Sequence, residues 1–385
     1  MFVSRRALEN AALGVAGVLT GVMLFLLMGA DGLRLASGQP VFGDFIAFWS
    51  AGRAALDGQA ERVHDVALVS EYSRAAVGGV GVVSPWNSPP TFLLIASALA
   101  TMPYLIAALA FLLVSAAVYL FAARKLLPDT RALIFAATLP AAVYHLGTVQ
   151  TGLVIAGISG LALHWLDRRP LASGALVGLL AIKPHLAILW PVLLLLSGRW
   201  RAFTAACAST GVFVCIAGAV FGFDSYGRFF DNLGASQALI NANRIGTPAF
   251  ASLYASLLNL DAPAVIAAAM QALSAVAALA VSALIFRWGD RALGGAALCA
   301  ATLLISPYLF FYDFTLLAVG AALLGAPRDR FELFAAIAAW GAGLSLVLSY
   351  ALPLPYCAAA AWLVLIATLR RARSAAGRPA AAPQP

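Results

Sequence analysis

The chain has 385 residues, of which 63% are hydrophobic and only 10% are charged. Because a soluble domain carries about 25% charged residues, this composition excludes a cytosolic enzyme and a disordered tail protein and indicates an integral membrane protein. The apolar runs are continuous and do not alternate with a period of two, which excludes a transmembrane β-barrel. At about 20 residues per crossing, we expect an all-α polytopic protein with about ten to twelve transmembrane helices.

The net charge of +8 comes from Lys and Arg clusters that lie between apolar segments. Such clusters indicate topology rather than nucleic-acid binding, because positive residues accumulate on the cytoplasmic side. If every cluster is cytoplasmic, each interval holds an even number of crossings, which predicts both termini inside. Arg5 and Arg6 precede an apolar run without a cleavage pattern, so we expect an uncleaved first helix. The clusters are Arg5/Arg6, Arg124/Lys125/Arg131, Arg168/Arg169, Arg199/Arg201, Arg287/Arg291, Arg328/Arg330 and Arg370/Arg371/Arg373.

We expect residues 1–373 to form a single integral membrane domain. Its first external loop, residues 31–87, contains six acids and four arginines and lies on the side that the basic clusters avoid. Over residues 44–58, aromatic and aliphatic side chains follow helical spacing, which predicts a helix lying on the outer membrane surface. A second external loop over residues 222–262 is rich in aromatic residues, and residues 374–385 are expected to be a disordered cytoplasmic tail.

Three intervals between basic clusters are so short that each must form a helical hairpin with a shallow tip. At 1.5 Å per residue, Lys183, His145 and Asp313 each lie about 21 to 22 Å along the chain from a cluster at the base of their hairpin. In a hydrocarbon core about 30 Å thick, the three side chains therefore reach one depth beneath the acidic outer loop. The intervals are 131–168, 169–199 and 291–328.

Asp44 lies at the start of the predicted surface helix, just before an aromatic run. It could simply be an N-terminal acid that interacts favourably with the helix dipole, at about 0.3–1 kcal/mol. Alternatively, it is a general base held against an apolar wall, where desolvation raises the pKa of a carboxylate toward the value that catalysis requires.

Lys183 is one of only two lysines and the only one inside an apolar hairpin. An intramembrane lysine costs about 2.5–3.5 kcal/mol on insertion scales, so it is expected to face a cavity or an anion. Snorkelling to the outer headgroups is the alternative, which its depth permits. Because Pro184 predicts a break that frees backbone groups to line a cavity, we favour a functional role.

The segment from Ser306 to Asp313 combines a helix break with two tyrosines and one acid. It could be an aromatic belt at the membrane interface or the wall of a binding site. Other polar residues are weaker candidates, because a lone histidine is more often a packing residue than a ligand. These weaker candidates are His64, Asp65, His145, Gln150 and His185.

Sequence motifs for common cofactors do not occur. There is no P-loop, HExxH, GxSxG or paired CxxC motif, and the four cysteines lie in apolar stretches without metal-ligand spacing. We therefore expect no nucleotide site, no cofactor and no metal ligands, while the sequence leaves a dependence on a divalent ion open.

Several segments resemble glycosyltransferase family 87, a family of polytopic membrane enzymes with the GT-C fold. The matching pieces occur in the expected order over about residues 40 to 315, and the ordered set is more specific than any single piece. The pieces are Asp44-Phe45 through Phe48-Trp49 with Ala51-Gly52, Gly58 with Val63-His64-Asp65, Ser88-Pro89-Pro90, Gly147 with Gln150, Lys183-Pro184 before Arg199-Trp200, and Ser306-Pro307 with Asp313.

The resemblance implies transfer of a hexose, typically mannose, from a polyprenyl-phosphate donor to a lipid or glycan acceptor hydroxyl, with inversion, at the outer face of the inner membrane. In this family the catalytic acid lies in the first external loop, and that role carries over to Asp44. A cation stabilises a leaving phosphate, for which Lys183 is the best candidate, with His185 and His145 as lesser donors. The candidate acceptor- or sugar-binding residues are Trp49, His64, Asp65, Gln150, Tyr312 and Asp313.

A secondary transporter or lipid flippase is the main alternative, because intramembrane Lys and Asp can serve as coupling sites. Transporters usually show two similar halves, whereas this sequence has no convincing internal repeat and concentrates its hydrophilic residues after the first helix. A non-catalytic scaffold for envelope assembly would leave the clustered polar hairpin tips unexplained. The sequence does not reveal the sugar, the acceptor, the linkage or the oligomeric state.

Overall fold

The computed structural model describes residues 4–78, 85–127, 129, 132–241, 250–288, 290–352 and 354–376. Within these residues every regular element is a helix, and the strand-like contacts are isolated bridges. Among the described residues, five segments are long and apolar enough to cross a membrane. They are Arg5–Met28 (α1), Tyr104–Leu126 (α5), Trp200–Phe221 (α12), Ala264–Trp288 (α15) and Arg330–Ala351, which comprises α18 and α19. This architecture confirms the expected all-α polytopic membrane protein.

The middle of the molecule is built from shorter apolar helices of 10–17 residues. They form the tight hairpins expected from the basic clusters, because breaks near the hairpin tips interrupt the helices before they reach full length. In this region the chain forms α4 (Pro90–Leu99), α9 (Gly152–Trp165), α10 (Pro170–Leu179), α16 (Arg291–Ile305), α17 (Thr315–Leu324) and α11 (Trp190–Leu196), which has 7 residues and is the last part of the apolar stretch Pro184–Leu196.

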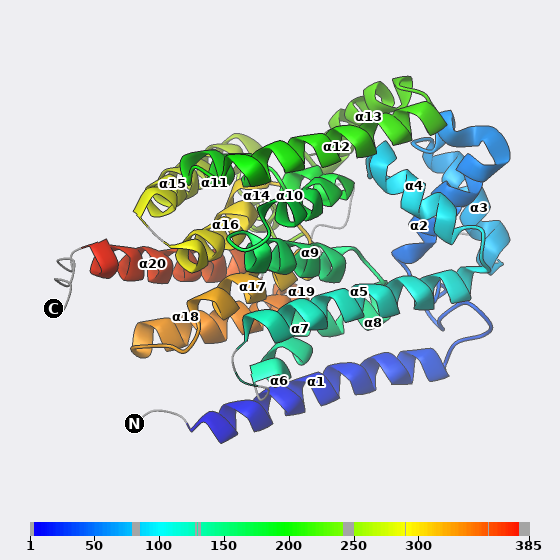
Figure 1. Cartoon of the computed structure of the whole chain (residues 1–385). Helices are drawn as coiled ribbons and strands as arrows, with labels where there is room; N and C mark the ends of the chain where they lie inside the picture. Colours follow the sequence, from blue (N-terminus) through cyan, green and yellow to red (C-terminus); the bar gives the residue numbers. More distant parts are fainter. Residues whose placement is uncertain are drawn as a thin grey trace, which may run out of the picture.

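The two ends of the helical bundle differ in the side chains that they carry. The helix α5 begins at Tyr104, whose hydroxyl contacts the carbonyl oxygens of Val41 and Phe42, and its last turn carries Arg124 and a lysine. The start of α1 and the end of α20 (Tyr356–Ala376) lie at the same end of the bundle as the last turn of α5 (Figure 1). We call this the basic end and the opposite end the site end. Because the first and the last helix begin and end, respectively, at this same end, the fold agrees with the predicted even number of membrane crossings.

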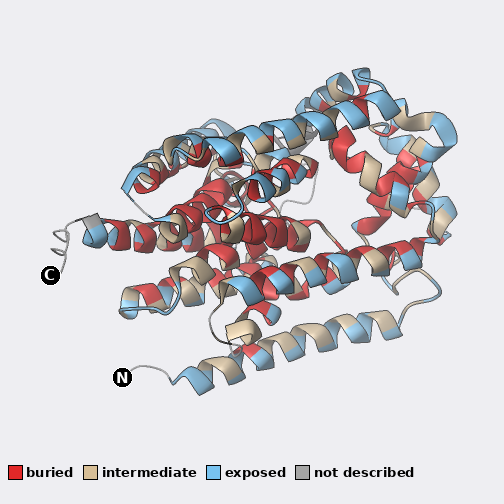
Figure 2. Cartoon of the chain, viewed as in Figure 1, coloured by how far each residue is buried: buried red, intermediate tan, exposed pale blue. Residues whose placement is uncertain are grey.

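The helix predicted in the first loop is present as α2 (Phe45–Ala54), which continues into η1 (Ala55–Gln59) and is followed by α3 (Val66–Val77). A Cβ atom on Gly52 would lie 2.2 Å from the carbonyl oxygen of Ala96 in α4, so the two helix backbones touch. Most of α2 is buried inside the protein (Figure 2). The apolar face that we expected to lie on lipid packs against α3, α4 and α5 instead. The position of this helix at the outer membrane surface stays a prediction.

The second external loop contains α13 (Asp224–Asn241) and α14 (Leu253–Asn259). Residues 242–249 of this predicted loop lie outside the described residues. Arg228 of α13 forms an ion pair of 3.0 Å with Glu61 of the first loop. The two segments that we expected to be external loops therefore pack together at the site end.

The last helix, α20, includes residues 374–376, for which we predicted disorder. Alanine extends a helix readily once the preceding turns are anchored. Arg371 provides such an anchor, because its guanidinium forms a buried ion pair of 2.6 Å with Glu332 of α18. The rest of the predicted tail, residues 377–385, lies outside the described residues.

Candidate active site

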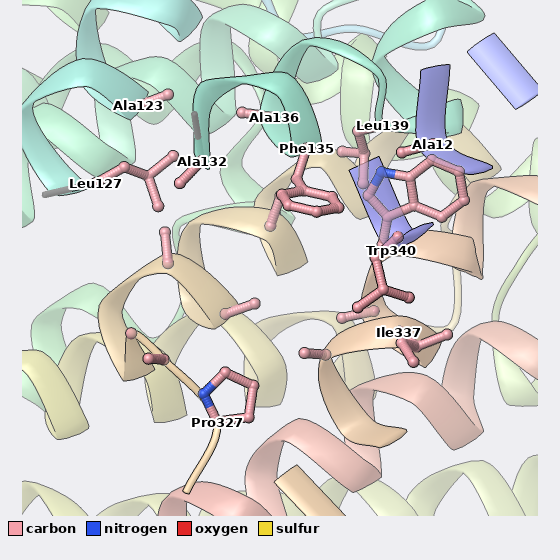
Figure 3. A pocket seen from close by; sticks show the side chains of 18 of the residues that line it. Ala12, Ala123, Leu127, Ala132, Phe135, Ala136, Leu139, Pro327, Ile337 and Trp340 are labelled. Atoms are coloured by element: carbon pink, nitrogen blue, oxygen red, sulfur yellow. The ribbon is translucent and has the colours of Figure 1, made fainter. Parts of the chain in front are cut away.

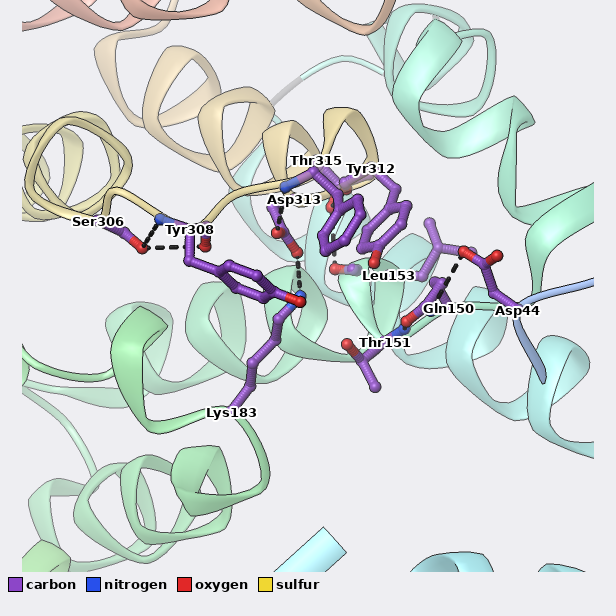
Figure 4. A network of polar contacts seen from close by, with 12 residues as sticks. Asp44, Gln150, Thr151, Leu153, Lys183, Ser306, Tyr308, Tyr312, Asp313 and Thr315 are labelled. Atoms are coloured by element: carbon purple, nitrogen blue, oxygen red, sulfur yellow. Dashed lines mark hydrogen bonds and ion pairs between the residues drawn. The ribbon is translucent and has the colours of Figure 1, made fainter. Parts of the chain in front are cut away.

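Interrupted helices meet at the site end of the bundle (Figure 4). The chain is broken around Gln150 between α8 (His145–Thr148) and α9, around Lys183 between α10 and α11, and around Asp313 between α16 and α17. Asp44, at the start of α2, completes the group. The hairpin tips that were expected to share one depth are thus brought together.

The break at Lys183 has a local cause. Lys183 has φ −145° and ψ 73° and lies between the short helices η3 (Leu180–Ile182) and η4 (Pro184–Leu186). Proline disfavours the helical conformation of the residue before it, so the expected break at Pro184 is confirmed. The hydroxyl of Thr91 donates to the carbonyl oxygen of Ala181 at 2.7 Å and so satisfies one backbone group near the break.

Lys183 forms a buried ion pair with Asp313. The lysine side chain is 14% exposed and the aspartate side chain 0% exposed. The second carboxylate oxygen of Asp313 accepts the backbone N–H of Phe310 at 3.0 Å, and the ammonium nitrogen lies 5.0 Å from the ring centroid of Tyr312. Lys183 therefore points into the protein rather than toward lipid headgroups.

Asp44 is held by Gln150, whose side-chain amide donates to the Asp44 carboxylate at 3.2 Å. The other end of this amide accepts the backbone N–H of Thr151 at 3.3 Å, which fixes its orientation. Asp44 makes no side-chain hydrogen bond to cap α2, so its carboxylate does not serve as a helix cap.

The electrostatic environment of Asp44 suits a base. Its side chain is exposed at the protein surface, while the protein that surrounds it on the other sides desolvates the carboxylate. This burial raises the pKa of Asp44 above its ordinary value, and the hydrogen bond from Gln150 and the positive charge of Lys183 lower it in part. A carboxylate that is accessible and has a raised pKa is a better proton acceptor than an ordinary surface aspartate.

Asp44 and Gln150, which form this hydrogen bond, each come one or two residues after a residue with a strained backbone conformation. Val149, directly before Gln150, has φ 50°, and Phe42, two residues before Asp44, has φ 60°. A left-handed conformation is rare for non-glycine residues and is a genuine outlier for β-branched valine. Strain of this kind persists only where the surrounding structure enforces it, and it is frequent at functional sites.

His145 is fully buried and uses both ring nitrogens. Its Nδ1 lies 2.8 Å from the carbonyl oxygen of Ala141, and its Nε2 accepts the backbone N–H of Leu153 at 3.2 Å. No ring nitrogen is left for a phosphate, so the structure does not support the expected ligand role for His145. A Cβ atom on Gly152 would lie 2.7 Å from His145 Nε2 and 2.4 Å from the carbonyl oxygen of Tyr312, which shows how tightly these two chain breaks pack.

The candidates in the first loop make contacts of their own. Trp49 donates its indole N–H to the carbonyl oxygen of Met102 at 2.9 Å. His64 contacts the carbonyl oxygen of Trp86 at 3.0 Å, and its pKa is lowered by burial. Asp65 accepts the backbone N–H groups of the first turn of α3 and is its N-cap. These contacts stabilise the loop, and none of them reaches Asp44.

His185 lies beside Tyr308, with ring centroids 6.2 Å apart, and within the described residues its buried Nε2 has no hydrogen-bond partner. Tyr308 itself belongs to a polar cluster that sequence reasoning missed. Its hydroxyl accepts from Asn87 at 3.4 Å, and Asn87 in turn accepts from Asn232 of α13 at 2.8 Å. Tyr308 is one of the two tyrosines of the segment that the sequence singled out, and Asn87 directly precedes the matching piece Ser88-Pro89-Pro90, whereas no sequence signal pointed to Asn232.

The fold and this site define a multi-pass membrane protein whose polar centre is assembled from helix breaks and the loop that follows the first long helix. The chain belongs to glycosyltransferase family 87, which it matches over residues 86–307. The match includes Gln150 and Lys183, while Asp44 and Asp313 lie outside it. No curated protein and no solved structure matches the chain. The protein is therefore a membrane glycosyltransferase that acts on a sugar donor and an acceptor.

Proposed function

We propose that the protein transfers a hexose from a polyprenyl-phosphate donor to a hydroxyl group of a lipid or glycan acceptor, and that this hexose is mannose. The transfer inverts the anomeric configuration and takes place at the outer face of the inner membrane. The observation that carries this proposal is the proximity of an accessible carboxylate with a raised pKa, Asp44, to a buried lysine, Lys183, whose charge acts on it.

Asp44 is the general base of this reaction. It takes the proton from the acceptor hydroxyl while the hydroxyl oxygen attacks the anomeric carbon of the sugar. The bond between that carbon and the phosphate oxygen breaks, and the polyprenyl phosphate leaves with the bonding electrons. Because this is one displacement from the opposite face, a β-linked donor gives an α-linked product. Gln150 is a positioning residue that orients the carboxylate.

Lys183 stabilises the leaving phosphate. Negative charge develops on the phosphate oxygen as the sugar departs, and a preorganised cation in a water-poor site lowers the free energy of that transition state. An ammonium group has three donors, and the contact with Asp313 uses only part of them. Asp313, itself held by the Phe310 N–H, keeps the lysine in place when no substrate is bound.

The direct test is incubation of the purified protein with a panel of labelled polyprenyl-phosphate hexoses and a membrane lipid extract. We expect label to move from the mannose donor to a lipid or glycan product, and the Asp44→Asn variant to be the inactive control. Transfer from a nucleotide sugar without any lipid-linked donor would overturn the donor class. Transmembrane movement of a labelled solute or lipid with no glycosidic product would instead support the transporter or flippase alternative.

A further inference from the structure

A large apolar cavity lies at the basic end of the bundle (Figure 3). Its volume is about 610 Å³, within the range of roughly 300–1,000 Å³ that is typical of ligand pockets. Its walls come from α1, α5, α17, α18 and the short helix α6 (Ala132–Ala137), and they consist mainly of alanine and leucine, with Tyr119, Phe135 and Trp340 as the aromatic side chains. None of the site residues described above lines it, so the cavity needs an explanation of its own.

The depth of the cavity corresponds to one membrane leaflet. The charged residues Arg5, Asp129 and Asp329 mark one end of it, next to the basic clusters, and Val15 of α1 lies farther along the helix. The helix from Arg5 to Val15 spans about 15 Å, which is half of a hydrocarbon core of about 30 Å. We call the charged end the mouth.

Along α1, aromatic side chains follow the cavity in the direction of the active site. An aromatic cluster of Tyr144, Phe311 and Tyr312 packs against α1 beyond Val15. The ring of Tyr312 is the one that faces the Lys183 ammonium. A hydrocarbon chain in the cavity would therefore enter at the basic end and not from the substrate site, which argues against the prenyl chain of the sugar donor.

The charges at the mouth are balanced. Arg5 forms an ion pair of 2.7 Å with Asp129, and Asp329 forms one of 2.8 Å with Arg370. Cations and carboxylates side by side can hold a headgroup that itself carries both a phosphate and an ammonium. Because Arg5 and Arg370 are each already paired with a carboxylate, they offer no unpaired positive charge to a purely anionic headgroup.

The protein does not fill this space with its own side chains. In α1, Ala12 is the one residue described as buried, so this helix borders the cavity without packing into it. An empty void of this size would leave its wall atoms without dispersion contacts. We propose that the cavity holds one acyl chain of a zwitterionic phospholipid from the leaflet at the basic end, retained as a resident lipid.

The experiment compares lipid retention by native mass spectrometry after purification in mild detergent. Ala322→Phe combined with Ala336→Phe fills the cavity from α17 and α18. The matched control, Ala117→Phe combined with Ala280→Phe, adds the same bulk at exposed helix positions. We expect the wild type and the control to retain a zwitterionic phospholipid and the filled variant to lose it.

A second measurement does not depend on the folding of the filled variant. Purified wild type and Trp340→Phe are titrated with phosphatidylethanolamine that carries brominated acyl chains, at near-stoichiometric amounts in detergent. We expect bromine to quench part of the wild-type tryptophan fluorescence, and Trp340→Phe to lack that part. Equal lipid retention by the filled and control variants, an anionic phospholipid or polyprenyl phosphate as the retained species, or unchanged quenching in Trp340→Phe would each overturn the proposal.

Discussion

Asp44 and Lys183 are charged groups of opposite sign that the protein holds by different means. Asp44 is accessible and is oriented by one neutral amide, whereas Lys183 is nearly buried and is paired with a carboxylate. An accessible base can meet an acceptor that arrives from outside, while a buried cation acts in a medium of low polarity, where charge interactions are stronger. This difference supports the proposed roles of Asp44 as the base and of Lys183 as the ligand of the leaving phosphate.

Replacing Asp44 tests the base. Asp44→Asn is nearly isosteric and can still hydrogen-bond with Gln150, but it cannot accept the proton. We expect the transfer rate to fall by about 10² to 10⁴, with little change in melting temperature or donor binding. Asp57→Asn, an exposed first-loop carboxylate that pairs with Arg53, is the matched control and should stay near wild type. Activity of Asp44→Asn within a few-fold of wild type would remove Asp44 from the mechanism.

The pH profile tests the environment of Asp44. Only the deprotonated carboxylate of Asp44 can act as a base. We therefore expect kcat/KM to rise as the pH increases through the raised pKa of Asp44, and to be lost as the pH falls through it. The hydrogen bond from Gln150 lowers this pKa, so Gln150→Ala should move the rising limb to higher pH. The measurement is kcat/KM against pH for both proteins. A limb that stays in place would show that Gln150 does not act through Asp44.

Replacing Lys183 tests the phosphate contact. Lys183→Met should lower donor affinity and turnover, because a charge-assisted contact contributes about 1.5–3 kcal/mol, or roughly ten- to a hundred-fold. Lys183→Arg should recover only part, since the guanidinium differs in shape. Kinetics against donor concentration give the result, and unchanged kinetics in a stable Met variant would exclude the phosphate role.

The ion pair adds a control for stability. Lys183→Met leaves Asp313 buried without its cation, which costs about 3–5 kcal/mol when one partner of a buried pair is removed. Adding Asp313→Asn should therefore restore much of the lost melting temperature, but not the transfer rate. If the double variant regained activity together with stability, Lys183 would have a structural role only.

At the scale of elements, the site depends on helices that stop early. Breaks at Gln150, Lys183 and Asp313 turn short helices into a polar centre at one height in the bundle. The contact between two of these breaks leaves room only for a glycine at position 152. The helix breaks therefore fix the geometry of the site as much as the charged side chains do.

Gly152→Ala tests this packing. Its new methyl group would lie 2.4 Å from the carbonyl oxygen of Tyr312, so the two breaks must separate, at about 1–3 kcal/mol. We expect a lower melting temperature and reduced transfer. Gly211→Ala in α12, where nothing lies within 4 Å of the added atom, is the control and should be stabilising by about 0.5–1 kcal/mol. Equal behaviour of the two variants would contradict the tight contact at Gly152.

At the scale of the whole molecule, the basic end and the site end give the protein a direction in the membrane. The basic clusters predict that the basic end faces the cytoplasm, which puts the site at the outer face. Labelling with an impermeant thiol reagent tests this orientation. The exposed Cys207 and Cys215 are first replaced by serine to remove background reaction.

In that background, Ala60→Cys lies in the first external loop and Ser374→Cys near the end of α20. We expect the cysteine at position 60 to react in intact cells and the one at position 374 to react only after lysis. The reverse pattern would show that the orientation and the outer-face active site are both wrong.

Local chemistry in the sequence was enough to predict the membrane class, the helix of the first loop and the break at Pro184. Apolar composition, helical periodicity and the restriction that proline imposes on Lys183 act within a few residues along the chain, so they can be read without a structure. The same is true of the unusual cost of a lysine in an apolar hairpin. These features also singled out Asp44 and Lys183 as candidates.

The tertiary structure alone decided which side chains meet. Segments far apart in sequence meet in the pairing of Lys183 with Asp313, in the cluster of Asn87, Asn232 and Tyr308, and in the burial of α2. Such contacts depend on how helices of particular length and tilt pack against one another. The same packing leaves the apolar cavity at the basic end. No local pattern in the sequence predicts this cavity, because its walls come from several helices.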